Sequence, residues 1–406
     1  MQRRAISLYH RIEHALKTIA AGSTPLETIQ QTAHFLAGGF SEDLGLTGGR
    51  IYTLQDGGYR IAATFGTAAK PPLGLIVDPS YTPIRKLFDN GVLVMHRDDP
   101  DLDAGLEDRL GTGRTFAAAI VDDGNFVLSF DVEADTAPRD DLVSTLNIVR
   151  LAINQQLREE RMAEIMEEAR RIQTSILPRH LPSPRDYRLA ARSTPAEVVG
   201  GDFYDYIALD RHSFDLVVAD ATGHGLPAAL QVRDVFTGLR MGLSREFKLT
   251  RTLERLNRII HRSRLATKFV SLFLAEVDHG GDVIYCCAGH PPALLVRENG
   301  QLEQLNVGGL PLGPFPDARY SAGVQRIEPG DTLVIYTDGI TEATDSKEEE
   351  FGVQRLAELV TARRRRRPQQ IVDEIFEAVH DFADRAEAQD DQTVMVIQRR
   401  KGRSNG

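Results

Sequence analysis

Hydrophobic and polar positions in the first third of the chain follow two different spacings. Residues 1–40 place apolar side chains at helical intervals and end at a glycine pair, which predicts helices up to that point. Two runs rich in β-type residues follow at Arg50–Leu54 and Tyr59–Thr64, and the Asp-Gly between them predicts a hairpin. A short helix, a strand and a second hairpin are predicted at Thr82–Phe88, Gly91–His96, Thr115–Val121 and Phe126–Val132.

A long helical pattern begins at Asp140 and continues to Leu177, directly before Pro178. Its apolar residues step by three and four, with a phase shift at the charged run Arg158–Arg161. Heptad-like spacing favours a coiled coil that joins two copies of the chain. The alternative is a single amphipathic helix that folds onto one of the domains.

Three prolines, Pro178, Pro182 and Pro184, mark a boundary after this helix. Strands are then predicted at Leu189–Ser193, Phe214–Asp220, Phe269–Val277, Val283–Ala288, Ala293–Glu298, Thr332–Thr337 and Thr393–Gln398. Helices are predicted at Pro227–Leu243, Arg251–Leu265, Val353–Arg363 and Gln369–Ala383. Strands that cluster between helix pairs favour an α+β fold over a repeated βαβ unit. The predicted divisions are a first domain at 1–139, a helical linker at 140–184, a second domain at 185–400 and a tail at 401–406.

Charge, cysteine content and hydropathy exclude several classes of protein. The chain has 48 Lys and Arg against 58 Asp and Glu, a net charge of −10, which lacks the footprint of a nucleic-acid-binding protein. The two cysteines, Cys286 and Cys287, are adjacent and form neither a disulfide framework nor a zinc motif. No apolar run approaches the ~18 residues of a membrane span, and the N-terminus is too charged for a signal peptide. We expect a cytoplasmic protein without membrane insertion or a nucleic-acid partner.

An arginine run, Arg363–Arg367, stands at the end of a predicted helix and before Pro368. The favoured interpretation is a solvated helix end, where cations suit the helix dipole. The alternative is a patch that binds phosphate or an acidic partner.

Aspartates in unusual settings carry the candidate chemistry of the second domain. Asp202 follows two glycines, Asp220 and Asp338 each end a hydrophobic run, and Asp390 and Asp391 directly precede a strand. Strand ends that converge on one rim of a sheet would gather hard oxygen ligands, which suit two Mg²⁺ or Mn²⁺ ions. Two such ions can activate a water for in-line attack on phosphorus. The alternative for each single Asp is an ordinary turn or helix cap.

Other phosphatase chemistries lack their motifs. Neither Cys286 nor Cys287 is followed six positions later by Arg, as a cysteine phosphatase requires, and no Arg-His-Gly motif of a phosphohistidine mechanism is present. The nucleotide-binding motifs GxxxxGK[ST] and GxGxxG are absent too. Cys287 is expected to be a small buried strand residue. Because histidine ordinarily titrates near neutral pH, His224 or His290 could protonate a leaving oxygen, but a structural role in their turns is favoured.

Six short segments follow one another in the second domain. Each is short, but the six in this order form a highly specific pattern. These are Gly200–Asp205, Asp220–Gly225, Ala288–Pro292, Gly309–Gly313, Tyr336–Glu342 and Asp390–Thr393. On these motifs residues 185–400 resemble the metal-dependent PPM serine/threonine phosphatases, and more narrowly the bacterial branch that controls sigma factors by partner switching.

The resemblance implies a fold of two antiparallel β-sheets flanked by helices. It implies that Asp202 bridges two Mn²⁺ or Mg²⁺ ions, that Asp220 and the carbonyl of Ala221 bind one ion, and that Asp338 and Asp390 complete the second site. Asp391 matches the family's motif less clearly and is kept as a reserve candidate for a metal ligand. The implied reaction is hydrolysis of phosphoserine or phosphothreonine on a partner protein, an anti-anti-sigma factor, by a metal-activated water.

Residues 1–139 resemble a GAF-type sensor domain in the order of their elements, with PAS as the competing label. A small molecule or a protein would act as the activator there, or the domain would serve dimerisation alone. The helical linker would carry the signal, and the protein is expected to form a homodimer.

Two other functions were weighed against the phosphatase. Gly200–Phe203 resembles part of the diguanylate cyclase motif, but that family needs Glu-Phe after the acid, where this chain has Phe203-Tyr204. A non-catalytic domain that binds a phosphoprotein is the other alternative, and the full set of acids argues against it.

Overall fold

The computed structural model describes residues 24–401 except 40, 68–70, 72, 134–136, 179–180, 183, 211, 224, 244–248 and 264–268. The chain forms two compact units that divide between Glu164 and Ile165, inside the long helix α6 (Arg139–Ile176). Each unit is described by itself below. Within the described parts of the chain, no helix is both long and apolar enough to cross a membrane.

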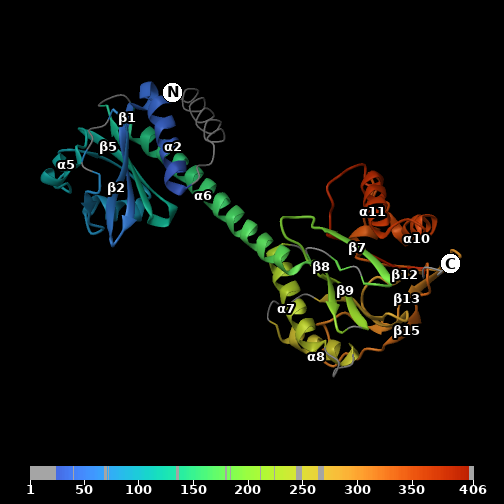
Figure 1. The fold of residues 1–406 in the computed structure, drawn as a ribbon. Helices are drawn as coiled ribbons and strands as arrows, with labels where there is room; N and C mark the ends of the chain where they lie inside the picture. The colour runs from blue at the N-terminus through green and yellow to red at the C-terminus, as the bar shows by residue number, and fades with distance from the viewer. Residues whose placement is uncertain are drawn as a thin grey trace. The chain divides into compact units, whose positions relative to one another are not determined.

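The N-terminal unit contains a six-stranded antiparallel sheet in the order β3-β2-β1-β6-β5-β4 (Figure 1). Its strands are β1 (Leu46–Gln55), β2 (Gly58–Gly66), β3 (Ile76–Val77), β4 (Val92–His96), β5 (Thr115–Val121) and β6 (Phe126–Val132). Both predicted hairpins are confirmed. The turn of the first places Asp56 at φ 50° and Gly57 at φ 79°, the left-handed pair that a tight two-residue hairpin requires.

Helices cover both faces of this sheet. They are α2 (Pro25–Gly39), α3 (Ser41–Leu44), α4 (Thr82–Asn90), α5 (Ala104–Leu110), the 3₁₀ turn η1 (Asp122–Gly124) and the first half of α6. The predicted helix before Gly38 is confirmed over α2, and its earlier part lies outside the described residues. On the face below α2, a core forms from Ile29 and Leu36 of α2 and the strand residues Ile51 and Phe130.

The apolar stripe in the first half of α6 belongs to this same core. Its members Leu142, Leu146, Val149, Ile153 and Leu157 are all buried against the sheet. This half of the helix therefore packs onto a domain, which was one of the two predicted arrangements. The spacing of the stripe is alike in both arrangements, because a helix presents one face to either kind of neighbour.

The C-terminal unit is built on two sheets packed face to face. The first has the order β14-β11-β10-β9-β8, with β15 also pairing to β11, and the second has the order β13-β12-β16-β17-β7. The strands are β7 (Tyr187–Thr194), β8 (Asp202–Ala208), β9 (Ser213–Ala221), β10 (Val270–Asp278), β11 (Asp282–Ala288), β12 (Ala293–Val296), β13 (Leu302–Leu305), β14 (Gly308–Gly309), β15 (Gly323–Arg326), β16 (Thr332–Tyr336) and β17 (Gln392–Arg399). The core between the sheets includes Phe214, Phe273, Leu295, Ile335 and Ile397.

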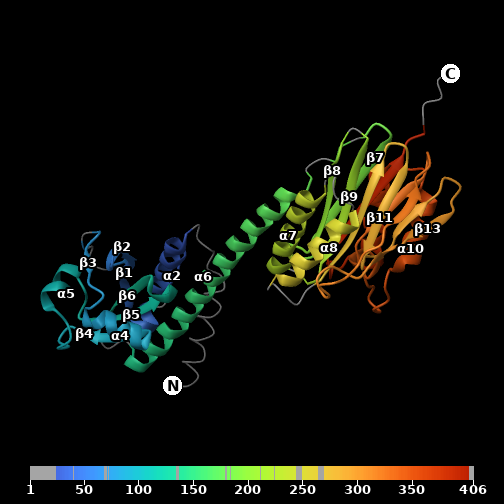
Figure 2. The same cartoon turned by 90° about the horizontal axis from the view of Figure 1, so that it is seen from below.

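A helix pair covers each outer face of this sandwich (Figures 1 and 2). Helices α7 (Leu226–Gly242) and α8 (Leu249–Arg262) pack on the first sheet, and α10 (Gly352–Arg363) and α11 (Pro368–Phe382) pack on the second. A four-residue helix, α9 (Asp338–Thr341), follows β16. The predicted α+β fold of two sheets flanked by helices is confirmed. The pairing is antiparallel throughout except for β11 with β14, which is parallel.

The sequence-based prediction missed strand β8, which begins at Asp202, directly after the two glycines. Strands β13 and β15 were also missed, since both are four residues long and carry polar side chains that give no clear alternation.

One carboxyl in this unit is buried without a compensating partner. Asp215 of β9 lies beside Glu276 of β10, and its Oδ2 has no hydrogen-bond partner among the described residues. Burial raises the pKa of Asp215 to about 8, and the charge of Glu276 adds to the rise. The folded state therefore binds this proton more tightly than the unfolded state does, so stability is highest in acid and falls as the pH rises through 8.

We expect Asp215→Asn to stabilise the protein above pH 8 by about 1–3 kcal/mol, because the variant removes the buried charge. Near pH 4 the variant and the wild type should unfold at similar temperatures. Thermal unfolding over a pH series checks this, with Asp317→Asn as the matched control, because Asp317 is exposed. Equal melting temperatures of Asp215→Asn and wild type at high pH would contradict the prediction.

Candidate metal centre

The first sheet delivers two aspartates to the same end. Asp202 opens β8 and Asp220 stands next to last in β9, and the two residues are direct partners in the antiparallel ladder. Partners of this kind have neighbouring side chains. A single pairing register therefore places both carboxyls side by side, although they are 18 positions apart in the sequence.

The second sheet delivers two more acids. Asp338 comes two residues after β16 and begins α9, and Asp390 comes two residues before β17, the neighbour of β16. A Cβ on Gly339 would lie 2.0 Å from the backbone oxygen of Asp391, so only glycine allows the two segments to approach this closely. Asp338 and Asp390 are near enough that the charge of Asp390 raises the pKa of Asp338.

A hydrogen bond joins the ends of the two sheets at the centre of this cluster. Thr337, between β16 and α9, donates from Oγ1 to Oδ2 of Asp202 over 2.7 Å. The same hydroxyl accepts from the backbone N–H of Thr393 at 2.9 Å. All three residues are buried. The carboxyl of Asp202 is thereby fixed to the second sheet although its backbone belongs to the first.

Negative charge accumulates here, and among the described residues no cation is one of the main influences on it. Burial raises the pKa of Asp202 well above its usual value, and the charge of Asp220 adds to the rise. Burial likewise raises the pKa of Asp220 to about 8, with further contributions from Asp338, Asp390 and Asp391. None of the main causes of these shifts is a cationic side chain. Carboxylates kept together in this way repel one another until a cation binds between them.

The donor set fits a hard divalent cation. It consists of carboxylate oxygens with a nearby backbone carbonyl, which are the ligands that Mg²⁺ and Mn²⁺ prefer. Among the described residues, no three acids, histidines or cysteines have side chains close enough together to enclose a metal ion. The fit therefore rests on the convergence of Asp202, Asp220, Asp338 and Asp390 and on their raised pKa values.

Asp391 makes contacts different from those of the other acids. Its Oδ1 accepts from the backbone N–H of Ala196 at 2.8 Å, and its Oδ2 accepts from the N–H groups of Gly201 and, at 3.3 Å, Asp202. A Cβ on Gly200 would lie 2.2 Å from this Oδ2. The carboxylate of Asp391 thus holds the glycine loop that leads into Asp202, and both of its oxygens are engaged in doing so.

Gly201 brings the carbonyl of Ala221 close to Asp202. A Cβ on Gly201 would lie 2.3 Å from the Ala221 oxygen, and the Ala221 N–H donates to the Gly201 oxygen over 3.0 Å. The predicted carbonyl ligand is therefore adjacent to the predicted bridging carboxylate.

Three further residues belong to this site and were not singled out from the sequence. Thr337 positions Asp202, as described above. Glu342 lies one helical turn after Asp338, and burial together with the charge of Asp338 raises its pKa. Gln173 of α6 binds the backbone of Gly200, with Nε2 donating to the oxygen over 2.6 Å and Oε1 accepting from the N–H at 3.1 Å. Of the three, only the spacing of Glu342 from Asp338 was visible as a sequence signal.

Two of the histidine and cysteine candidates, His290 and Cys287, are buried and bonded to neighbouring residues. His290 is buried with Nδ1 2.7 Å from Oγ of Ser271, and burial lowers its pKa to about 3, so its ring is neutral near pH 7. These observations support a structural role. Cys287 is buried, burial raises its pKa to about 11, and its thiol donates to the His290 oxygen. His224 lies outside the described residues.

Comparisons with known proteins agree with this fold. Residues 210–400 match the family model of the stage II sporulation protein E, SpoIIE. The chain is 27% identical over 276 residues to Protein IcfG of Synechocystis sp., covering 58% of this chain and 43% of IcfG. It is 27% identical over 248 residues to the phosphoserine phosphatase RsbU of Bacillus subtilis, covering 60% of this chain and 72% of RsbU.

A solved structure supports the fold alone. The SiaA-PP2C domain of Pseudomonas aeruginosa superposes with a TM-score of 0.53 at 19% identity, over 59% of this chain and 98% of that one. The C-terminal unit therefore has the fold of a PP2C-type (PPM) phosphatase. Within that class, residues 210–400 are similar to the SpoIIE family.

Without metal, substitutions of Asp338 and Asp391 are expected to change the stability of the protein in opposite directions. Asp338→Asn should raise the stability of the chelator-treated protein by roughly 1 kcal/mol, because it removes one of several like charges. Asp391→Asn should lower it by about 2 kcal/mol, because an amide cannot accept all three N–H groups. Thermal unfolding in EDTA measures both. Destabilisation by Asp338→Asn, or no effect of Asp391→Asn, would contradict the description of the site.

Proposed function

We propose that this protein is a metal-dependent protein serine/threonine phosphatase. The supporting observation is the convergence of Asp202, Asp220, Asp338 and Asp390 from both sheets, with no cation among the main influences that the described residues exert on Asp220. In this proposal Asp202 bridges two Mn²⁺ or Mg²⁺ ions. Asp220 and the Ala221 carbonyl serve one ion, and Asp338 and Asp390 serve the other.

The chain's own residues would orient and stabilise the reacting groups. When bound, the two ions supply Lewis-acid charge and a nucleophilic water at neutral pH. Thr337 keeps the Asp202 carboxyl in one orientation, and Asp391 keeps the loop before it in place. We assign Asp391 this positioning role and retain it as a reserve ligand. No covalent enzyme intermediate is needed, and both cysteines are buried with raised pKa values.

The substrate is proposed to be a phosphoserine or phosphothreonine on a partner protein. RsbU, one of the relatives, is named a phosphoserine phosphatase. Together with the partner-switching resemblance, this supports an anti-anti-sigma-like protein as the partner.

The direct test is hydrolysis of an aryl phosphate and of a phosphoserine protein with and without Mn²⁺. We expect turnover that requires the metal and that falls at least about 100-fold in Asp338→Asn, since charge stabilisation at the reacting phosphate is lost. Asp317→Asn removes the same charge from an exposed position of the same domain and should retain activity.

Two results would support the alternatives. Binding of Mn²⁺ and of the phosphoprotein without turnover would indicate a non-catalytic binding domain. Formation of a cyclic dinucleotide from GTP would indicate a diguanylate cyclase and refute the phosphatase.

The N-terminal unit is proposed to be a GAF-like sensor. Its six-stranded antiparallel sheet with helices on both faces supports this. A cavity of about 40 Å³ lies between the sheet and α4, lined among others by Tyr52, Tyr81 and Glu107. This volume holds one or two water molecules, so a small-molecule activator would have to enlarge it. A protein activator would not need that change.

Regulation is proposed to run through α6, because one end of this helix contacts the site's own loop. Gln173 makes two hydrogen bonds to Gly200, whose Cα packs against the Asp391 carboxylate. A shift or rotation of α6 would move this loop, and with it the backbone that leads into Asp202. The affinity for metal would change as a result.

The second half of α6 also supports the proposed homodimer. Its apolar residues Met162, Ile165 and Ile172 are all exposed, between 46% and 55%. They fall on the a and d positions of one heptad frame, which is the pattern of a coiled-coil seam. Ala169 of the same frame is buried in the C-terminal unit.

Gln173→Ala should weaken the coupling between helix and loop. We expect the Mn²⁺ concentration for half-maximal activity to rise about fivefold or more. A factor of about five corresponds to the lower end of the range of allosteric coupling energies. Gln155→Ala, an exposed glutamine of the same helix whose bond is to Glu159, is the matched control and should leave it unchanged. Unchanged metal dependence in Gln173→Ala would contradict the coupling.

Insertions between Ala163 and Glu164 test the same idea independently. One inserted residue turns the rest of the helix by about 100°, whereas seven restore its phase to within about 20°. Activity and its regulation should change with the single insertion and recover with seven. Equal behaviour of both variants and the wild type would refute transmission through helix phase.

A further inference from the structure

A strongly basic groove lies in the C-terminal unit, apart from the aspartates. Its volume is about 1050 Å³. Its cationic lining residues are Arg185, Arg188, Arg364, Arg365, Arg399, Arg400 and Lys401, and its acidic ones are Asp186 and Glu298. Gln398 and Gly330 complete the lining. Such a concentration of positive charge is unexpected in a chain with a net charge of −10.

The groove is at the opposite end of the second sheet from the candidate metal centre. Thr332 of β16 pairs with Gln398 of β17 at the groove end, and both strands run from there to Asp338 and Asp390. At ~3.3 Å per residue, the six residues from Thr332 to Asp338 separate the two regions by roughly 20 Å. The groove is therefore a separate site.

The arginine run at the end of α10 is fixed in place by a buried glutamine. Gln398 donates from Nε2 to the backbone oxygen of Arg364 over 2.8 Å and to that of Arg366 over 3.4 Å. Arg364 in turn donates from Nε to the oxygen of Glu298 over 3.0 Å. The end of the helix and the β12–β13 turn are thus held together at the groove.

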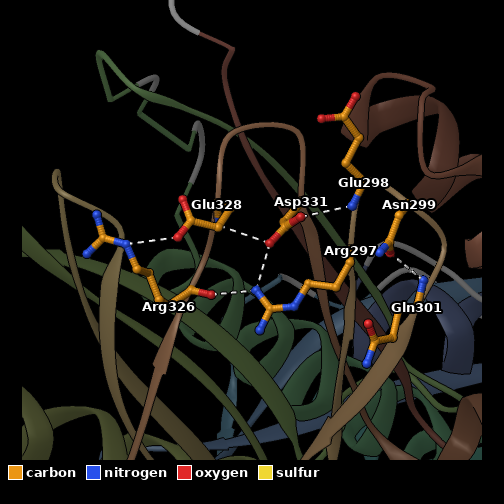
Figure 3. Close-up of a pocket in the computed structure, with 7 residues that line it drawn as sticks. All are labelled: Arg297, Glu298, Asn299, Gln301, Arg326, Glu328 and Asp331. Atoms are coloured by element: carbon orange, nitrogen blue, oxygen red, sulfur yellow. Dashed lines mark hydrogen bonds and ion pairs between the residues drawn. The ribbon is translucent and has the colours of Figure 1, made fainter.

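A second network fixes the loop that carries Glu298 (Figure 3). Asp331, which is 2% exposed, accepts from the backbone N–H groups of Glu298 and Glu328 and from the Arg297 side chain, all at 2.8–2.9 Å. Arg326 pairs with Glu328 beside it. The wall of the groove is therefore ordered, and several of its cations take part: Arg399 and Arg400 donate to backbone oxygens of Ile327 and Tyr187, and Lys401 pairs with Glu298.

Three of those cations have no partner within the described residues. Arg185, Arg188 and Arg365 make no ion pair or side-chain hydrogen bond there, whereas Arg363, in the same run as Arg365, pairs with Glu374. A solvated helix end explains Arg365 alone. It does not explain why a loop and two strands contribute further arginines to the same concave surface.

The chemistry of the lining defines the ligand class. Guanidinium groups present paired donors that match phosphate oxygens. The lining contains no aromatic residue on which a nucleic-acid base would stack, and no apolar anchor of the kind that dominates protein interfaces. We propose that the groove is a binding site for a compact, phosphate-rich anion, with Arg188 and Arg365 as two of its ligands.

The test measures binding of inorganic triphosphate to the full chain by calorimetry in EDTA, at low and at raised salt. EDTA removes any metal from the aspartate cluster, so the result is independent of catalysis. The double variant Arg188→Gln/Arg365→Gln should bind at least about tenfold more weakly than wild type. Arg251→Gln/Arg258→Gln removes the same charge from exposed positions on α8 and should bind like wild type.

Several results would overturn the proposal. One is the absence of any heat of binding up to about 1 mM triphosphate, the weakest affinity of interest. Another is an equal loss of triphosphate binding in the two double variants. Tighter binding of an acidic peptide or an oligonucleotide than of triphosphate would assign the groove to a macromolecule instead. Unfolding temperatures of both double variants, expected to equal that of wild type, show that a loss of binding is not a loss of fold.

Discussion

The hydrogen bond from Thr337 to Asp202 is the contact on which the candidate metal centre depends. Each sheet alone carries two acids at one end, and neither pair encloses a cation. The Thr337 hydroxyl, itself fixed by the Thr393 N–H, ties the buried carboxyl of the first sheet to the second. Because the sheets pack through a shared apolar core, this single polar contact sets the separation of the two pairs. The packing of the two sheets therefore sets the distance between the two pairs of carboxyls, and with it their mutual repulsion.

The glycine loop before Asp202 is held from two directions. Asp391 binds it from the second sheet, and Gln173 binds it from α6. Both contacts are to backbone groups, and the neighbouring glycines leave no room for a side chain. A loop fixed only through backbone hydrogen bonds moves as one piece with whatever holds it. This makes it suited to transmit a small displacement.

The acids of the site were predictable because each has a local signal, whereas their supports were not. Asp220 and Asp338 end hydrophobic runs next to glycine, a pattern visible within ten residues. Gln173 binds a backbone group 27 positions away, and Asp391 binds one 190 positions away, so only the folded chain reveals them. The cationic residues of the basic groove are likewise dispersed from Arg185 to Lys401. The stripe in α6 was ambiguous because a sheet and a second helix require the same spacing.

Asp338 and Asp390 flank one end of the β16–β17 pair and the cations of the basic groove lie at the other, which gives the domain an electric dipole along the strand direction. At physiological ionic strength the Debye length is about 8 Å, well below the separation of the ends. Each end therefore attracts its own counterions with little influence from the other. At the two proposed sites, divalent cations would gather at one pole and anions at the other, so a dissolved polyphosphate would not be drawn first to the proposed metal site.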